Sequence, residues 1–172
     1  MNEFDEIWPE MLSRALEKAR VSGRHDVADY LNLKATNDDL RKAGSAWLID
    51  TMLEIAGAAN RKTAGISIER LDSHNFAWRG ANMAGTLLRL RYGVRCLTLE
   101  TGWTRTPADG FMRGGALVFA RITHFGMAKQ NAEIVLLQSN STPAWHVYSE
   151  EKAGAHFRSE SMLGHFRIFL SE

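Results

Sequence analysis

The stretch TLLRLRYGVRCLTLETGW, residues 86–103, is the part of the sequence that decides the fold. Apolar and polar residues alternate on both sides of Tyr92-Gly93, which is typical of a β-hairpin with a two-residue turn at that point. Such a turn places Leu88 opposite Leu97. One face of the hairpin is then apolar and the other polar, whereas a slip by one residue would mix the two sets. The apolar face carries Leu88, Leu90, Leu97, Leu99 and Trp103, and the polar face carries Arg89, Arg91, Thr98 and Glu100.

Other short apolar runs after residue 60 predict further strands. They lie at residues 66–69, 76–78, 117–123, 132–138 and 145–148. The last apolar stretch, residues 159–170, fits a short helix followed by a strand. Hairpin-length connections favour antiparallel over parallel pairing, so we expect about six to seven strands in a mainly antiparallel sheet.

The first 60 residues have helical rather than alternating periodicity. From Phe4 to Ala19 the apolar residues form one helical stripe that contains Pro9, which either begins the helix or kinks it. Ser22-Gly23 predicts its end. A second helix is expected at about residues 26–34, and a third after Thr36, which we expect to cap it.

The order of these elements predicts an α+β fold. We expect an N-terminal helical segment of about three helices to pack on the antiparallel β-sheet. At 172 residues the chain is the length of one domain, with residues 1–60 helical and residues 61–172 β-rich. There is no alternating strand–helix–strand pattern, so a dinucleotide-binding fold is not expected.

Composition excludes several classes of protein. A hydrophobic fraction of 45% and a charged fraction of 24% are ordinary for a globular chain and argue against disorder. No apolar run approaches the roughly 20 residues of a membrane span, so we expect no membrane partner. Cys96 is the single cysteine, which excludes an intramolecular disulfide. With no apparent signal peptide, this favours a cytoplasmic location.

The net charge of +1 hides an uneven distribution. Residues 1–60 hold 7 basic and 11 acidic side chains, residues 61–130 hold 11 and 4, and residues 131–172 hold 3 and 5. Arginine dominates the middle segment and is interleaved with aromatic residues, a pattern that suits an anionic partner. Two other interpretations stay open: the arginines solvate the outer face of the sheet, or they pair with the acidic helices.

Residues 101–115 form the second distinctive feature, with four glycines and one proline in fifteen residues. A connection of this length between strands exceeds the usual two to five residues, and long loops often have a function. Together with the basic segment it suggests a non-enzymatic domain that binds nucleic acid, a nucleotide-like ligand or an acidic protein. The candidate ligand-binding residues are Arg89, Arg91, Arg105, Arg113 and Trp103.

An enzyme with an acid–base pocket between helices and sheet is an alternative hypothesis. Its candidate residues are Asp109, Glu100, His124 and His146, although Asp109 before glycine is also typical of a turn. No phosphate loop, paired-cysteine motif or nucleophile elbow is present. The histidine spacings match no metal-ligand signature, so we expect no metal and no cofactor.

A structural or oligomeric interaction protein is the third hypothesis, because homodimers are common and their interfaces are rich in aromatic residues and methionine. The candidate interface residues are Trp8, Met11, Leu12 and Trp47.

Overall fold

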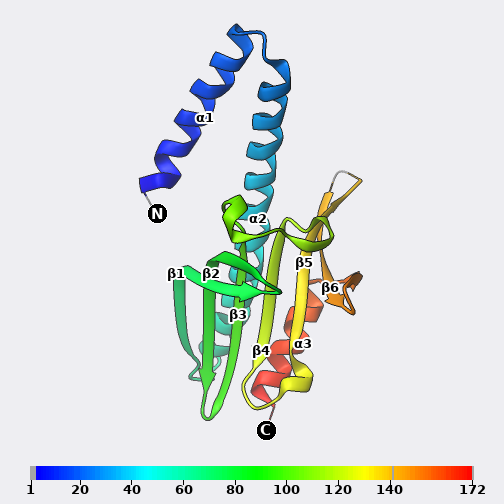
Figure 1. Cartoon of the computed structure of the whole chain (residues 1–172). Coiled ribbons are helices and arrows are strands. Elements are labelled where there is room, and N and C mark those ends of the chain that lie inside the picture. Colours follow the sequence, from blue (N-terminus) through cyan, green and yellow to red (C-terminus); the bar gives the residue numbers. More distant parts are fainter. Residues whose placement is uncertain (1–2, 141, 172) are drawn as a thin grey trace. The chain divides into compact units, whose positions relative to one another are not determined.

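A computed structural model describes residues 3–140 and 142–171 of the chain (Figure 1). Its helices are α1 (Glu3–Val21), α2 (His25–Arg61) and α3 (Ser159–Leu170). Its strands are β1 (Ser67–Trp78), β2 (Ala81–Tyr92), β3 (Arg95–Trp103), β4 (Val118–His124), β5 (Ala132–Ser139), β6 (Thr142–Ser149) and β7 (Lys152–His156). Short 3-10 turns lie at Pro107–Asp109, Arg113–Gly115 and Ala128–Gln130.

The chain divides into two compact units, one ending at Leu40 and the other beginning at Arg41. The first unit contains α1 and the beginning of α2. As predicted, α1 ends just before Gly23, whose φ of 73° is one that glycine adopts without strain. Pro9 lies inside α1, so the alternative in which it begins the helix is wrong. The ammonium group of Lys34 lies 5.0 Å from the centre of the Trp8 ring, within this unit.

The helix break expected near Thr36 is absent, because α2 runs unbroken from His25 to Arg61. The Thr36 hydroxyl donates a hydrogen bond to the carbonyl oxygen of Asn32, 3.0 Å away and one turn earlier. A threonine inside a helix commonly makes this bond, whereas a capping threonine would accept one from the following turn. Two helices therefore precede the sheet, where about three were expected.

The second unit contains a seven-stranded antiparallel sheet in which the strands follow one another in chain order, β1 to β7. This confirms the predicted α+β class and the predicted antiparallel sheet. The central hairpin, however, pairs Leu88 with Leu99 rather than with Leu97. Gly93, with a φ of 57°, occupies the first position of the turn, as a type II′ turn requires. The turn is therefore at Gly93-Val94, one residue later than predicted, and the register shifts by two residues.

Several strand limits also differ from the predictions. The two short runs at residues 66–69 and 76–78 belong to one long strand, β1, which has an irregularity between Leu71 and His74. No run predicted β7, whose residues are all exposed. The strand expected at the end of residues 159–170 is wrong, because α3 continues to Leu170 and buries Phe166 and Phe169 at helical spacing.

One face of the sheet packs on helices. The indole nitrogen of Trp145 donates to the carbonyl oxygen of Gly44 in α2, over 3.3 Å. At the other end of the sheet, Arg95 donates to the carbonyl oxygen of Ile168 in α3, over 3.2 Å. The buried apolar side chains of α2 and α3 that pack here are Leu48, Ile49, Met52, Ala56, Met162, Phe166 and Phe169.

The opposite face has an apolar cluster of its own. The rings of Trp78 in β1 and Phe119 in β4 stack with their centres 4.0 Å apart, although two strands lie between β1 and β4. The ends of β1 and β2 must therefore bend over this face of the sheet, as Figure 1 shows. The buried residues of the cluster are Trp78, Ala81, Met83, Ala116, Phe119, Val135 and Tyr148.

Candidate functional site

Most ion pairs of the arginine-rich middle segment are made within the second unit itself. Arg89 pairs with Glu69 at 2.7 Å across β1 and β2. Arg121 pairs with Glu100 at 2.6 Å across β3 and β4. Three further arginines have carboxylate partners outside residues 1–60: Arg70 with Asp72, Arg79 with Glu133 and Glu151, and Arg113 with Glu151. For these five arginines, the carboxylate partners lie on the β-rich part of the chain rather than on the acidic helices.

A cavity of about 190 Å³ lies between α2 and the first three strands, wholly within the second unit. We call it the α2–β3 pocket. Buried residues such as Ile49 and Trp103 form its floor, and exposed charged residues such as Arg70 and Arg105 form its rim. The pocket is lined by Lys42, Ser45, Ala46, Ile49, Arg70, Asp72, Gly85, Thr86, Thr101, Trp103 and Arg105.

Arg105 is held in a defined position at the rim of the pocket. Its guanidinium carbon lies 3.8 Å from the centre of the Trp103 ring, a stacking contact that suits this planar cation. One terminal nitrogen donates to the carbonyl oxygen of Ala84, over 3.1 Å. Because the ring and the carbonyl already restrict its rotamers, Arg105 would lose little conformational entropy on binding a ligand.

The pocket combines positive charge with hydroxyl groups. Lys42, Arg70 and Arg105 contribute three positive charges, and Asp72, which accepts a hydrogen bond from Arg70 at 2.7 Å, contributes one negative charge. The hydroxyl oxygens of Ser45 and Thr101 lie 3.2 Å apart and form a hydrogen bond that links α2 to β3. Cationic and hydroxyl donors around one small cavity are chemically suited to an oxyanion.

Residues 101–115, expected to be one loop, have two parts. The first three complete β3 and place Trp103 in the pocket, and the rest contain two 3-10 turns. The Asp109 carboxylate accepts from the backbone N–H and hydroxyl of Thr106, over 2.8 and 2.9 Å, and from the N–H of Arg105. These bonds, chiefly those from Thr106, lower the pKa of Asp109. Asp109 thus stabilises the turn that follows Arg105.

Glu100 forms a polar cluster on the sheet face opposite the helices. One carboxylate oxygen lies 2.7 Å from Nε2 of His74, and the other accepts from two nitrogens of Arg121. Burial acts to raise the pKa of Glu100, but the hydrogen bonds and charges of His74 and Arg121 outweigh it and lower this pKa. The ionised carboxylate therefore fixes both partners. Neither His74 nor Arg121 was among the predicted site residues.

The four acid–base candidates do not come together. Glu100 contacts His74 and Arg121, and Asp109 contacts its own turn. His124 lies on the helix-facing side, where its Nε2 is 3.0 Å from Nδ1 of His165 in α3. His146 makes a different contact: its Nδ1–H donates a hydrogen bond to the carbonyl oxygen of Gly154, over 3.1 Å.

Of the five predicted ligand residues, the structure brings two, Trp103 and Arg105, into the α2–β3 pocket. Arg89 and Arg113 pair with Glu69 and Glu151. Arg91 is exposed at the end of β2. Sequence reasoning missed three pocket residues, Lys42, Ser45 and Arg70. Of these, only Arg70 carried a signal, since it belongs to the basic middle segment.

The fold and the pocket define an α+β protein with a basic, hydroxyl-lined cavity beside a seven-stranded antiparallel sheet. No protein-family model matches the chain, no curated protein matches it, and no solved structure matches it. Within residues 3–140 and 142–171, no group of three or more potential metal ligands is present. In the same residues, none of the helices has both the length and the apolar character needed to cross a bilayer.

Proposed function

We propose that this protein is a non-enzymatic binding protein that holds a small oxyanion, a phosphate or carboxylate group, in the α2–β3 pocket. The observation that supports this is the convergence of Lys42, Arg70 and Arg105 on one cavity that contains a single carboxylate, Asp72. The lining of the pocket therefore holds three basic side chains and one carboxylate, and its cationic and hydroxyl donors suit an anionic group.

The stacked Arg105 is the residue on which recognition depends most. A guanidinium presents two parallel N–H groups to a carboxylate or phosphate, which adds geometric specificity to the charge. The hydroxyls of Ser45 and Thr86 would complete the ring of donors around the ligand. The pocket volume of about 190 Å³ leaves room for a small molecule that carries the anionic group, but not for a polymer.

The test is calorimetric titration of the purified protein with inorganic phosphate and, separately, with acetate. In the double variant Arg70→Gln/Arg105→Gln we expect the Kd of the preferred anion to rise at least about tenfold, because charge-assisted hydrogen bonds contribute roughly 1.5–3 kcal/mol each. The control is Arg89→Gln/Arg113→Gln, which removes the same charge from residues that do not line the pocket. We expect this control to bind as the wild type does.

Two results would contradict the proposal. If neither anion bound the wild type, the pocket would have no role of this kind. Equal weakening in both double variants would show a general effect of net charge rather than a site.

The cytoplasmic location also remains a proposal. It is supported by Cys96, a free and half-buried thiol, since lone reduced cysteines are typical of reducing compartments. The oligomeric alternative is supported by exposed apolar side chains of the first unit, among them Trp8 and Met11 at 39% and 57% exposure. Light scattering at high protein concentration tests it, and a monomer would exclude it.

A further inference from the structure

A second exposed surface lies at the end of the sheet where β2 turns into β3 and β4 leads into β5. We call it the turn-tip surface. It is separate from the α2–β3 pocket and shares no residue with it. Its members are Arg61, Lys62, Arg91, Val94, Phe125 and Lys129, all of them exposed.

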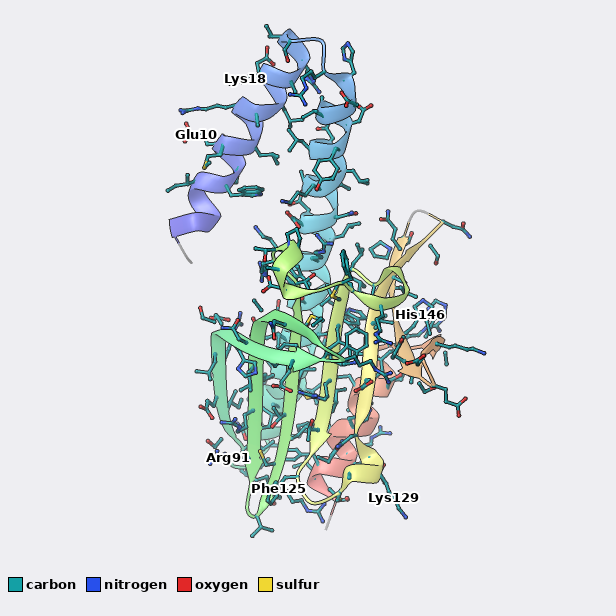
Figure 2. All side chains as sticks on the ribbon, viewed as in Figure 1. Glu10, Lys18, Arg91, Phe125, Lys129 and His146 are labelled. Carbon is teal, nitrogen blue, oxygen red and sulfur yellow. The ribbon has the colours of Figure 1, made fainter. Side chains whose placement is uncertain are left out.

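Strand pairing brings these residues to one end of the second unit. Arg91 pairs with Ser67, which follows the end of α2 by a few residues. The backbone N–H of Phe125 donates to the carbonyl oxygen of Cys96, over 2.9 Å, and joins the two tips. Arg95 reaches the last turn of α3 from the same hairpin. Figure 2 shows Arg91, Phe125 and Lys129 at this common end.

The segments that form this end of the second unit carry basic side chains and no acidic one. Four segments form it, residues 60–66, 91–96, 124–131 and 168–171, and together they contain five basic residues and no acidic one. The basic residues are Arg61, Lys62, Arg91, Arg95 and Lys129. Glu172 follows the last segment and lies outside the described residues. Such a surface suits an anionic partner rather than a neutral one.

Its two most prominent side chains are apolar. Val94 is 94% exposed at the tip of the β2–β3 turn, and Phe125 is 74% exposed at the start of the β4–β5 connection. Turn tips usually carry glycine, asparagine, aspartate or serine, and each of these turns has its glycine, Gly93 and Gly126, beside the apolar residue. Neither exposed apolar side chain is therefore explained by the needs of the turn.

We propose that the turn-tip surface binds the surface of a lipid bilayer that contains anionic lipids. Val94 and Phe125 insert among the headgroups, and the surrounding lysine and arginine side chains contact lipid phosphates and carboxylates. Buried apolar area combined with electrostatic attraction is the usual basis of peripheral membrane binding. The expectation of no membrane partner rested on the lack of a long apolar run. A membrane-spanning helix needs such a run, but a peripheral contact made by turns does not.

A nucleic acid is the other large anion that a basic surface could bind. Stacking on bases requires aromatic rings. Phe125 has one, but the more exposed of the two tips carries an aliphatic side chain, Val94. An aliphatic residue that projects from a basic surface gains free energy in the acyl boundary and gains none against a phosphate backbone. The bilayer is therefore the occupant that the side chains favour.

The test is co-sedimentation of the full chain with vesicles of phosphatidylcholine alone and of phosphatidylcholine with phosphatidylserine. We expect binding only to the second, lost at high salt. Arg91→Gln/Lys129→Gln should weaken partitioning about 25-fold, since each basic residue near an anionic surface contributes about fivefold. Phe125→Ser should weaken it about tenfold or more through the lost apolar burial.

Matched controls separate this surface from the rest of the chain. Phe111→Ser removes a phenylalanine that is 84% exposed in the β3–β4 connection, away from the turn tips, and should leave partitioning unchanged. The pocket variant Arg70→Gln/Arg105→Gln should also retain vesicle binding, which distinguishes this proposal from the proposed anion site.

Three results would overturn the proposal. The first is the absence of sedimentation with phosphatidylserine vesicles. The second is equal loss in Phe111→Ser and Phe125→Ser. The third is tight binding to a single-stranded oligonucleotide together with vesicle binding that is unchanged in Phe125→Ser. That result would identify a nucleic-acid surface instead.

Discussion

Replacing Gly85 by alanine is expected to lower the free energy of unfolding by about 3 kcal/mol. Gly85 lies within β2, opposite Gly102 of β3. A Cβ atom at residue 85 would lie 1.9 Å from the carbonyl oxygen of Thr101, a backbone atom that no rotamer change can move. The two strands would have to separate where β2 bends, next to both the α2–β3 pocket and the Trp78–Phe119 cluster.

Urea denaturation of the purified protein measures this effect. Gly164→Ala in α3 is the matched control, because no atom lies within 4 Å of its added Cβ and its backbone is helical. Alanine is favoured over glycine inside a helix by about 1 kcal/mol, so the control should be neutral or slightly stabilised. Equal stability of Gly85→Ala and the wild type would show that β2 and β3 are not so closely apposed.

The class of fold could be predicted because it depends on periodicity alone. Alternation with a period of two places Leu88 and Leu99 on the same face whichever of them is paired with the other. The predicted register was wrong by two residues for this reason: a shift of two leaves both faces unchanged, so the hydrophobic pattern cannot detect it. Only the position that glycine takes in the turn, at Gly93, distinguishes the two registers.

The helix break at Thr36 was wrong for a different reason. Capping residues act locally, and the same threonine that can cap a helix can also bond to the carbonyl oxygen one turn earlier. The structure shows the second bond, to Asn32. Likewise β7 escaped prediction because all five of its residues are exposed, so that no apolar pattern marks it.

The candidate site divides in the same way between local and long-range information. Trp103 and Arg105 are two residues apart, and the sequence could predict their contribution from one segment. Lys42 and Ser45 belong to α2 and reach the pocket only because that helix packs on the sheet, as the Ser45–Thr101 hydrogen bond shows. No spacing in the sequence encodes a contact between residues 56 positions apart.

The buried histidine pair is expected to make the protein less stable as pH falls below about 6.5. His124 is 2% exposed, its Nδ1 has no hydrogen-bond partner among the described atoms, and its Nε2 lies against His165. Burial, together with the neighbouring His165, lowers the pKa of His124 to about 4, and burial lowers the pKa of His165. No carboxylate contributes to either shift, and Arg95, which reaches α3 near His165, is also cationic.

The free energy of unfolding is therefore highest above pH 6.5, where both histidines are neutral in the folded and unfolded states alike. Below that pH the unfolded chain binds protons that the folded one excludes, and stability falls until the folded pKa is reached. For His124 alone, the free energy of unfolding falls by about 2 kcal/mol at about pH 5 and by about 3 kcal/mol at about pH 4. His165 adds to it in the same direction. Glu100 and Asp109, whose pKa values are lowered, act below this window.

Denaturation in urea between about pH 7.5 and 5 measures this loss. In His124→Leu/His165→Leu, which has similar side-chain volumes and no imidazole at either site, we expect most of the pH dependence in this range to disappear. His25→Leu, at an exposed position on α2, should keep it. Should the double variant fail to fold, NMR titration of the wild type still decides the matter. A His124 imidazole that becomes protonated near pH 6.5 in the folded protein would show that the buried pair is not held neutral.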